Sequence, residues 1–413
     1  MVPTIDAARG RALTVICFVT PVLGVVAPKG LAPFFALMAL VALLLLWRAP
    51  GPLFPRGVMA FPALVFALLL ASWAGFSPVW ALQPVDATSG AARLLAMAIG
   101  GALLVRLALP AGFAPVTLLG PFAIAGYCLA LAFTIFEYQT GGAFYELTHS
   151  ALMPVWEMDS FLDRAFCILT LGIWPILVAL GRRRTAQLGL LGLTAGVVFF
   201  AANMATKLAF ALGLLAMLAA FWRPGVSGRV LAGIVAATVL LAPVAVELLP
   251  SPGTVTGAPG TPESSLTHRL MVWHFASDRI SERPVLGWGM DASRYVPGAF
   301  AEIRPGANYL PNHPHNGALQ VWLELGPVGA VLLAAFLWRA VRGLARPTPD
   351  GRVPGMLGFL ASAFTIAGLS FGLWQGWWLA TLVLMAVLAL LVLGRSTPGR
   401  EDGAADDPAA AWR

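Results

Sequence analysis

Charged residues are scarce in this sequence. Asp, Glu, Lys and Arg make up only 11% of its 413 residues, whereas 59% are hydrophobic. A soluble domain carries about 25% charged residues, so the composition excludes an ordinary water-soluble globular protein. Long runs of Leu, Ala, Val and Gly separate the few charges.

Cysteine is also rare. Cys17, Cys128 and Cys167 lie far apart, in or beside apolar runs, and form no CxxC pair. We therefore expect neither a disulfide framework nor a metal site, and we interpret the three as small core residues. The sequence has no HExxH and no P-loop, and Gly287-Trp288-Gly289 lacks the strand–turn–helix setting of a nucleotide fingerprint. No metal and no cofactor is predicted.

The apolar runs predict an all-α polytopic membrane protein with about twelve transmembrane helices. A helix needs about 20 apolar residues to cross the hydrocarbon core, and only helices satisfy their own backbone groups in lipid. The candidate spans lie near 12–28, 31–47, 58–75, 91–109, 113–136, 165–181, 186–203, 205–222, 229–249, 316–338, 353–373 and 375–394. The predicted divisions are helices 1–9 in residues 1–249, a loop at 250–315, helices 10–12 in 316–394 and a tail at 395–413.

The basic residues predict the orientation. With the N-terminus in the cytoplasm, the inside connections hold most Lys and Arg, including Arg182, Arg183 and Arg184. This is the positive-inside pattern, and it places both termini in the cytoplasm and the 250–315 loop outside. The formal net charge of +7 has the same explanation, so no nucleic-acid partner is expected.

Two sizeable extracytoplasmic segments remain, at about 137–164 and 250–315. They contain all five histidines, His149, His268, His274, His313 and His315. A mere connection would need about 2–8 residues, so the longer loop is expected to be structured and functional. Its pattern predicts an amphipathic helix that carries Arg269 and Trp273, a Pro/Gly turn at 284–289 and a second short helix at 291–302.

Three basic residues are predicted near the outer ends of spans, against the positive-inside bias. They are Arg93, Arg164 and Lys207. Each is compatible with an interfacial anchor, but together they predict an outward-facing basic group. Arginine binds phosphate bidentately, so a lipid-linked phosphate or diphosphate is the predicted ligand.

The end of the loop carries a specific pattern. His315-Asn316, nine further residues, then Gly326-Pro327-Val328-Gly329 resembles the signature of bacterial O-antigen ligases. Arg269 with Trp273, and the 284–289 turn, resemble the periplasmic loop of the same family. Asp163-Arg164 resembles a family arginine at the outer start of a middle helix, whereas Lys207 stands where relatives often have Ser/Thr-Arg.

The resemblance implies a fold of the membrane-embedded C-type glycosyltransferase kind in the bacterial inner membrane. It implies transfer of a glycan from undecaprenyl diphosphate to a sugar hydroxyl on the periplasmic side, without metal. The acceptor is lipid A-core in a ligase, or a growing polysaccharide in a polymerase of O-antigen or exopolysaccharide repeat units. The motifs do not separate these two.

The chemistry of the residues agrees with this implication. A diphosphate leaving group needs its charge neutralised, which we assign to Arg164 and Arg269, with Lys207 as a weaker third. A histidine near neutral pKa can take a proton from the acceptor hydroxyl or orient it, which we assign to His315. His313 and Asn316 are predicted to support it.

A lipid-linked glycan transporter or flippase is the alternative from another class. Carriers often have internal repeats and ionisable groups at the midplane. This sequence shows no convincing repeat, and its intramembrane charges favour the outer ends. A structural scaffold is less favoured still, because it would leave the His315 pattern without a role.

Overall fold

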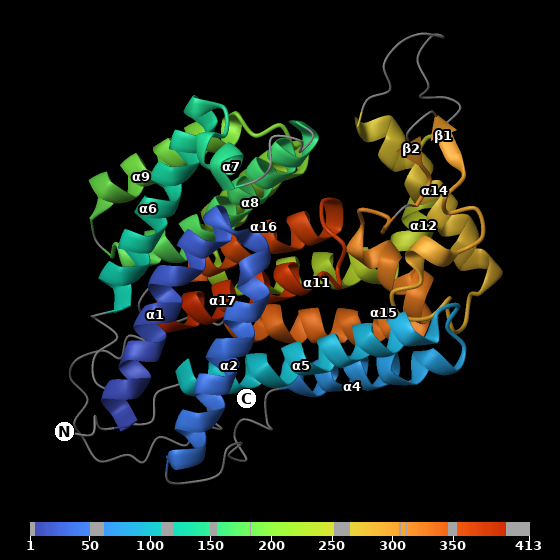
Figure 1. Cartoon of the computed structure of the whole chain (residues 1–413), viewed down its shortest axis with the longest axis horizontal. Helices are drawn as coiled ribbons and strands as arrows, with labels where there is room; N and C mark the ends of the chain where they lie inside the picture. Colours follow the sequence, from blue (N-terminus) through green and yellow to red (C-terminus); the bar gives the residue numbers. More distant parts are fainter. Residues whose placement is uncertain are drawn as a thin grey trace.

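The structure is a computed structural model that describes residues 5–49, 62–108, 119–148, 155–181, 183–251, 265–304, 307–310, 312–345 and 353–393. Nearly all regular structure in these ranges is α-helical; short 3₁₀ turns and a short antiparallel pair, β1 (Glu302–Arg304) and β2 (Ala307–Asn308), make up the rest (Figure 1). The predicted all-α polytopic architecture is confirmed at this level. The predicted tail at 395–413 lies outside the described residues.

Twelve predicted spans coincide in position with apolar helices. The first six correspond to α1 (Ile5–Val26), α2 (Leu31–Arg48), α4 (Pro62–Phe76), α5 (Pro84–Ala108), α6 (Leu119–Thr140) and α8 (Val155–Ala179). The next three correspond to α9 (Arg184–Phe199), α10 (Met204–Trp222), and α11 (Pro224–Leu240) with α12 (Ala242–Glu247). The last three are α15 (Gly317–Leu344), α16 (Val353–Leu369) and α17 (Gly376–Leu393). Among the described residues, seven helices are long and apolar enough to cross a membrane and five are shorter, so crossing by all twelve stays a prediction.

Helix α8 lies at the centre of one core. It packs against α1, α6, α16 and α17, and most of its residues are buried. The Trp174 indole donates to Ser362 Oγ at 2.9 Å, and that hydroxyl donates to the Ala209 carbonyl at 2.8 Å. These bonds join α8, α16 and α10. The helix begins ten residues before the predicted span 165–181, because polar residues such as Asp159 and Asp163 lower the hydropathy without ending the helix.

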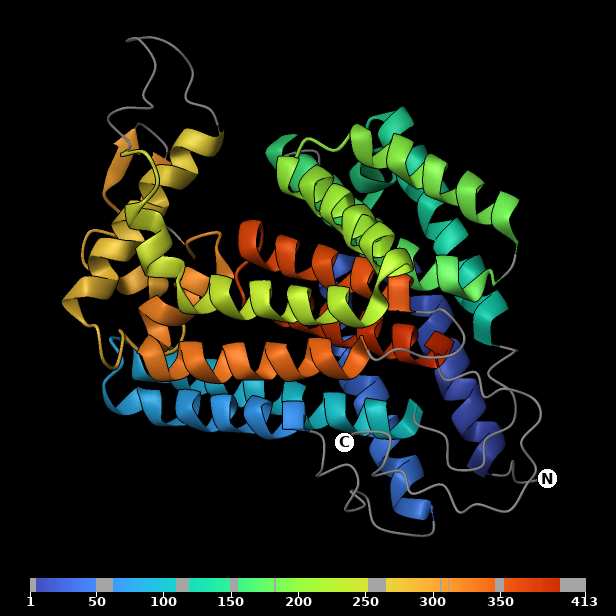
Figure 2. The same ribbon diagram turned by 180° about the vertical axis from the view of Figure 1, so that it is seen from behind.

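A second core lies between α15 and the loop that precedes it. Helix α15 packs between α4 and α11, and all three run side by side (Figure 2). The same core contains residues of helix α14 (Ser265–Glu282) and of the segment after it, among them Val272, Trp288 and Met290. The predicted extracytoplasmic loop is therefore a packed part of the fold over its described residues.

Helix α15 is broken at Gly326, which has φ 63° and is followed by Pro327. Proline has no backbone N–H to donate, so carbonyls of the preceding turn need other donors. The amides of Trp288 and Gly289 donate to the carbonyls of Leu323 and Glu324, each at 2.9 Å. The Trp73 indole donates to the next carbonyl, that of residue 325, at 2.9 Å. The 284–289 turn therefore completes the broken helix.

Glycine is required on both sides of this contact. A Cβ on Gly326 would lie 2.5 Å from the Val285 carbonyl oxygen, and a Cβ on Gly287 would lie 2.7 Å from the Glu324 backbone. Gly287 also has a positive φ of 69°, which side chains disfavour. The 284–289 turn and the Gly326 break, which are separate motifs in the sequence, thus pack directly against each other.

The prediction of a second helix at 291–302 is wrong. A short 3₁₀ turn, η4 (Ser293–Tyr295), is followed by turns and by strand β1. Pro297 cannot donate a helical hydrogen bond and Gly298 has φ 82°, so the helical pattern ends there. The other part of the loop prediction, a helix carrying Arg269 and Trp273, corresponds to α14.

Candidate functional site

Helix α14 is fixed to the histidine motif by one indole. Trp273 Nε1 donates to the Pro314 carbonyl at 3.0 Å. At the other end of the helix, Trp288 Nε1 donates to the Arg279 carbonyl at 2.8 Å. Since Arg269 lies about one turn before Trp273, the bond from Trp273 to Pro314 brings this arginine to the start of α15.

The histidine motif is a strained turn closed by a helix cap. His315 has φ 50°, a conformation that side chains other than glycine rarely adopt. Asn316 is the N-cap of α15, and its Oδ1 accepts from the amides of Ala318 and Leu319, each at 3.1 Å. The predicted supporting role of Asn316 is therefore seen as a cap that fixes the turn in which His315 lies.

The imidazole of His315 is held in one tautomer. Its Nδ1 lies 2.7 Å from the Ser370 carbonyl oxygen, which can only accept, so Nδ1 carries the proton. In the neutral ring, Nε2 then has the free lone pair. Burial lowers the His315 pKa, with smaller contributions from the charges of Arg269 and His268, and the Ser370 bond partly opposes them. The ring is accordingly neutral near pH 7 and can accept a proton at Nε2.

His313 lies directly beside His315. The ring centroids are 4.4 Å apart, and His313 Nδ1 accepts from the backbone amide of His315 at 3.2 Å. Burial, aided by His315 and Arg294, lowers the His313 pKa to about 3. His313 therefore stays neutral, and what it contributes is support for the turn of His315.

Arg269 is half-buried at the same place. Burial lowers its pKa, and the carboxylate of Asp163 on α8 partly restores it. Within the described residues the guanidinium makes no hydrogen bond or ion pair at contact distance, so its donors are available to a ligand. Because Arg269 acts electrostatically on both His315 and Asp163, the loop, α15 and α8 meet at this point.

Arg164 and Lys207 face different neighbours. The Arg164 guanidinium lies 5.8 Å from the ring centre of Trp377, which packs against Phe371. It therefore lies at the α16–α17 segment that also holds His315. The prediction placed Arg164 at the start of its helix, whereas it lies on the third turn of α8. Lys207, on the first turn of α10, lies 5.4 Å from the ring centre of Phe199, and among the described residues no hydrogen bond or ion pair joins it to Arg269 or His315.

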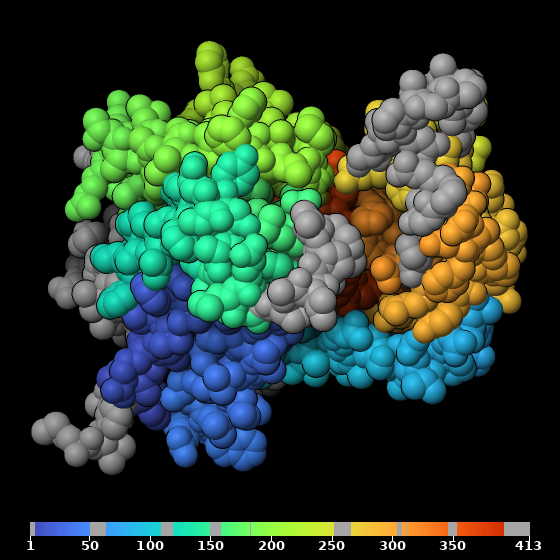
Figure 3. Space-filling view, turned by 45° about the horizontal axis from the view of Figure 1, so that its top comes forward, coloured from blue at the N-terminus to red at the C-terminus, as the bar shows by residue number. Residues whose placement is uncertain are grey.

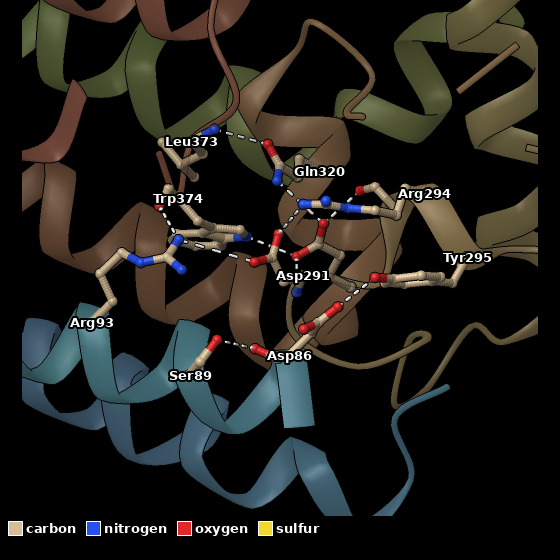
Figure 4. A network of polar contacts seen from close by, with 11 residues as sticks. Asp86, Ser89, Arg93, Asp291, Arg294, Tyr295, Gln320, Leu373 and Trp374 are labelled. Carbon is tan, nitrogen blue, oxygen red and sulfur yellow. Dashed lines mark hydrogen bonds and ion pairs between the residues drawn. The ribbon is translucent and has the colours of Figure 1, made fainter. Parts of the chain in front are cut away.

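Arg93, predicted to belong to the outward-facing basic group, contacts protein groups in the structure. Its Nη1 donates to the Trp374 carbonyl at 3.0 Å and lies 4.0 Å from Asp291 Oδ2 (Figure 4). Arg294 approaches the other oxygen of Asp291 at 3.7 Å, and Tyr295 donates to Asp86. These contacts attach the loop to α5 and give Arg93 a structural role, and its membership of the basic group stays a prediction.

Two residues in this region were given no role from the sequence. Gln320 and Glu324 are buried on α15, and with Asn316 they recur at every fourth residue. The side chain of Gln320 accepts from the Leu373 amide at 2.8 Å (Figure 4). Polar residues at helical spacing inside an apolar span are costly, and this spacing was the signal that could have found them.

Ser370 was not predicted either, although it stands in Gly368-Leu369-Ser370-Phe371-Gly372, which has G-x-S-x-G spacing. That motif supplies a nucleophile only at a strand-to-helix turn, whereas Ser370 follows the end of helix α16. Its hydroxyl accepts from the side-chain Nδ2 of Asn203 at 3.3 Å. The backbone N–H of Asn203 donates to the Asp163 carboxylate at 3.3 Å. Ser370 therefore connects His315 with α8 and α10.

The surface is hollowed where these elements converge. Figure 3 shows a depression between the green part of the chain and the gold and orange part, with orange and red surfaces at its floor. Helices α8 and α14, which carry Arg164 and Arg269, stand on opposite sides of this region (Figure 1). The arrangement could receive an anion between two arginines and beside the free nitrogen of His315.

Comparison with known proteins agrees with the motif. Residues 165–334 match the model of the family described as "O-Antigen ligase", a range that contains Lys207, Arg269 and His315. Three relatives, each named "Putative polysaccharide ligase", come from Rickettsia felis, Rickettsia bellii and Rickettsia conorii. They are 25%, 26% and 24% identical over 79%, 56% and 65% of this chain, and the matches cover 79%, 58% and 66% of the relatives.

Proposed function

Because the chain belongs to the O-antigen ligase superfamily, we propose that it is an O-antigen ligase-like glycosyltransferase. It moves a glycan from undecaprenyl diphosphate to a sugar hydroxyl of lipid A-core, on the periplasmic side of the bacterial inner membrane. The observation that carries the proposal is the meeting of a half-buried arginine and a neutral, tautomer-fixed histidine, Arg269 and His315.

Arg269 and Arg164 are the proposed diphosphate contacts. The guanidinium of Arg269 keeps its charge in a partly buried place, and among the described residues Asp163 is the carboxylate that acts on it, without an ion pair, which favours an anionic ligand. Fixed cations stabilise the charge that develops on a departing diphosphate. Lys207 provides a third positive charge, but as a single ammonium it cannot hold two phosphate oxygens in parallel as arginine can.

His315 Nε2 is the proposed acceptor of the hydroxyl proton. As the acceptor oxygen bonds to the anomeric carbon of the donor glycan, the bond from that carbon to the diphosphate oxygen breaks. The electron pair leaves with undecaprenyl diphosphate, and the proton of the hydroxyl passes to Nε2. A histidine that only orients the hydroxyl would serve the same geometry, because a diphosphate leaves readily.

Transfer by the purified protein tests the proposal. The protein is incubated with undecaprenyl-diphosphate-linked glycan, with and without lipid A-core, and the products are separated on a gel. Transfer that requires lipid A-core is the expected result. A lengthened glycan in its absence would identify a polymerase instead, and absence of any turnover with donor shown to bind would count against both and favour the transporter.

The periplasmic position of the site has a separate test. A reporter enzyme that works only outside the cytoplasm should be active when fused after Pro250. A reporter that works only in the cytoplasm should be active when fused after Arg346. The reverse pattern would contradict the proposed side of the membrane and with it the access of a periplasmic acceptor to His315.

A further inference from the structure

Glu324 is a fully buried carboxylate in an otherwise apolar stretch of α15. Burial of a charge is costly unless its oxygens are well bonded. Its Oε1 accepts from Ser293 Oγ and from Gln320 Nε2 at 3.1 Å. Its Oε2 accepts from the Asp291 amide and from Trp374 Nε1, each at 2.7 Å. All four donors are internal, so Glu324 has no oxygen left for a substrate.

These donors come from three separate parts of the chain. Asp291 and Ser293 belong to the periplasmic loop, Gln320 to α15, and Trp374 to the segment between α16 and α17, which we name the 370–375 connector (Figure 4). The carboxylate is therefore the point at which the loop and the connector are fastened to the same helix.

The connector is the segment that holds the imidazole of His315. Its first residue supplies the Ser370 carbonyl that accepts from His315 Nδ1. Further along, the Leu373 amide donates to Gln320 and the Trp374 indole to Glu324. A displacement of the Trp374 end would be transmitted over four residues to the carbonyl that fixes the tautomer.

We propose that Glu324 is a positioning residue for His315, acting through Trp374 and the connector. The inference rests on the proposed function for its kinetic consequence, but its structural part concerns His315 alone. By holding the connector against α15, Glu324 keeps the Ser370 carbonyl on Nδ1 and so keeps the lone pair of Nε2 toward the acceptor hydroxyl.

The sharpest test removes one donor with little change of shape. Trp374→Phe deletes the indole N–H and leaves Glu324 in place. Trp322→Phe is the matched control. Trp322 lies on α15, like Glu324, but its indole donates to the Val239 carbonyl at 2.8 Å, away from the connector. We expect Trp374→Phe to lower kcat about tenfold or more, since small misplacements of a reacting group are costly, with the KM for the donor within twofold. Trp322→Phe should leave both constants near wild type.

A second readout does not depend on turnover. In protein with ¹⁵N-labelled histidine, the His315 signals, assigned with His315→Ala, report which nitrogen carries the proton. The wild type should show protonated Nδ1, and Trp374→Phe and Glu324→Gln should lose part of that population. The Ser370 bond raises the His315 pKa, so its loss should also move the acid limb of kcat to lower pH.

The outcomes are distinct. A folded Trp374→Phe protein with unchanged kcat and unchanged ¹⁵N signals would overturn the proposal. So would an equal loss of kcat in both tryptophan variants, which would indicate a general packing effect. If the wild type transfers no glycan, the proposed function fails, whereas the ¹⁵N comparison still decides whether Glu324 positions His315.

Discussion

The Nδ1 of His315 donates to the carbonyl oxygen of Ser370 across 2.7 Å. This single contact determines which imidazole nitrogen can serve as a base, and it joins the turn before α15 to the segment after α16. The chemistry proposed for the site depends on it, because a histidine with an unprotonated Nδ1 would present an N–H to the acceptor and could not take its proton.

The pH dependence of transfer should follow His315. Burial and neighbouring positive charge hold its pKa below the ordinary value of 6.5. A histidine is neutral above its pKa and charged below it. Activity that needs neutral His315 should therefore be present at pH 7 and be lost only as the pH falls below 6.5. The measurement is kcat/KM against pH, with unfolding followed in parallel. An acid limb above pH 6.5 would contradict the assignment.

His315→Ala should reduce kcat by about 10²–10⁴-fold, the usual contribution of a general base, while donor binding persists. His274→Ala is a matched control, because His274 lies partly buried on α14 and its Nε2 is 3.3 Å from the Pro250 carbonyl oxygen, not beside His315. Near-normal transfer by His315→Ala in folded protein would remove this residue from the mechanism.

Arg269 should act through the shape of its guanidinium as well as its charge. Arg269→Lys keeps the charge but loses the fork that holds two phosphate oxygens, so we expect the donor KM to rise about tenfold and Arg269→Ala to be inactive. Arg279→Ala on the same helix is the control, since Arg279 pairs with Glu282 at 2.9 Å. A wild-type KM in Arg269→Lys would show that charge alone suffices.

Arg164 should matter more than Lys207. Arg164 lies at the segment that holds His315, whereas Lys207 lies against the exposed ring of Phe199. We expect Arg164→Ala to abolish transfer and Lys207→Ala to reduce it by less than tenfold, measured as kcat/KM for the donor. Equal losses would instead place both cations on the diphosphate.

Asn316 should affect both stability and activity through its cap. Asn316→Ala removes the acceptor of two amides and should cost about 0.5–2 kcal/mol of stability. Asn316→Asp retains an acceptor oxygen and should recover most of that loss in a thermal unfolding experiment. If Asn316→Ala unfolds like the wild type yet is inactive, the side chain contacts substrate and is more than a cap.

Gly326→Ala should be strongly destabilising, because the new Cβ would meet the Val285 carbonyl oxygen at 2.5 Å and the φ of 63° disfavours alanine. The conformational cost alone is about 1–2 kcal/mol. Gly189→Ala on α9 is the control, since no atom lies within 4 Å of its Cβ position, and it should unfold at or above the wild-type temperature. Similar unfolding temperatures for the two variants would refute the close joint between turn and helix.

The sequence alone determined the apolar helices. Their positions follow from the transfer of each side chain into lipid, a local property that adds along the chain, so the helices that carry the site appear where they were predicted. The start of α8 was misplaced because polar residues such as Asp163 were taken as the boundary of a helix that in fact continues through them. The His315 pattern also pointed to the family, since its spacing is contained in one stretch of chain.

Only the tertiary structure decided what the polar residues do. Arg93 was grouped with the ligand-binding cations from its position, and only the structure shows that it also bonds the Trp374 carbonyl and lies beside Asp291. Ser370 and Glu324 were given no role from the sequence, although one fixes the tautomer of His315 and the other holds the loop against α15. The partner of a buried polar group is set by which distant segment packs against it, and the free energy of that contact depends on geometry that no local pattern records.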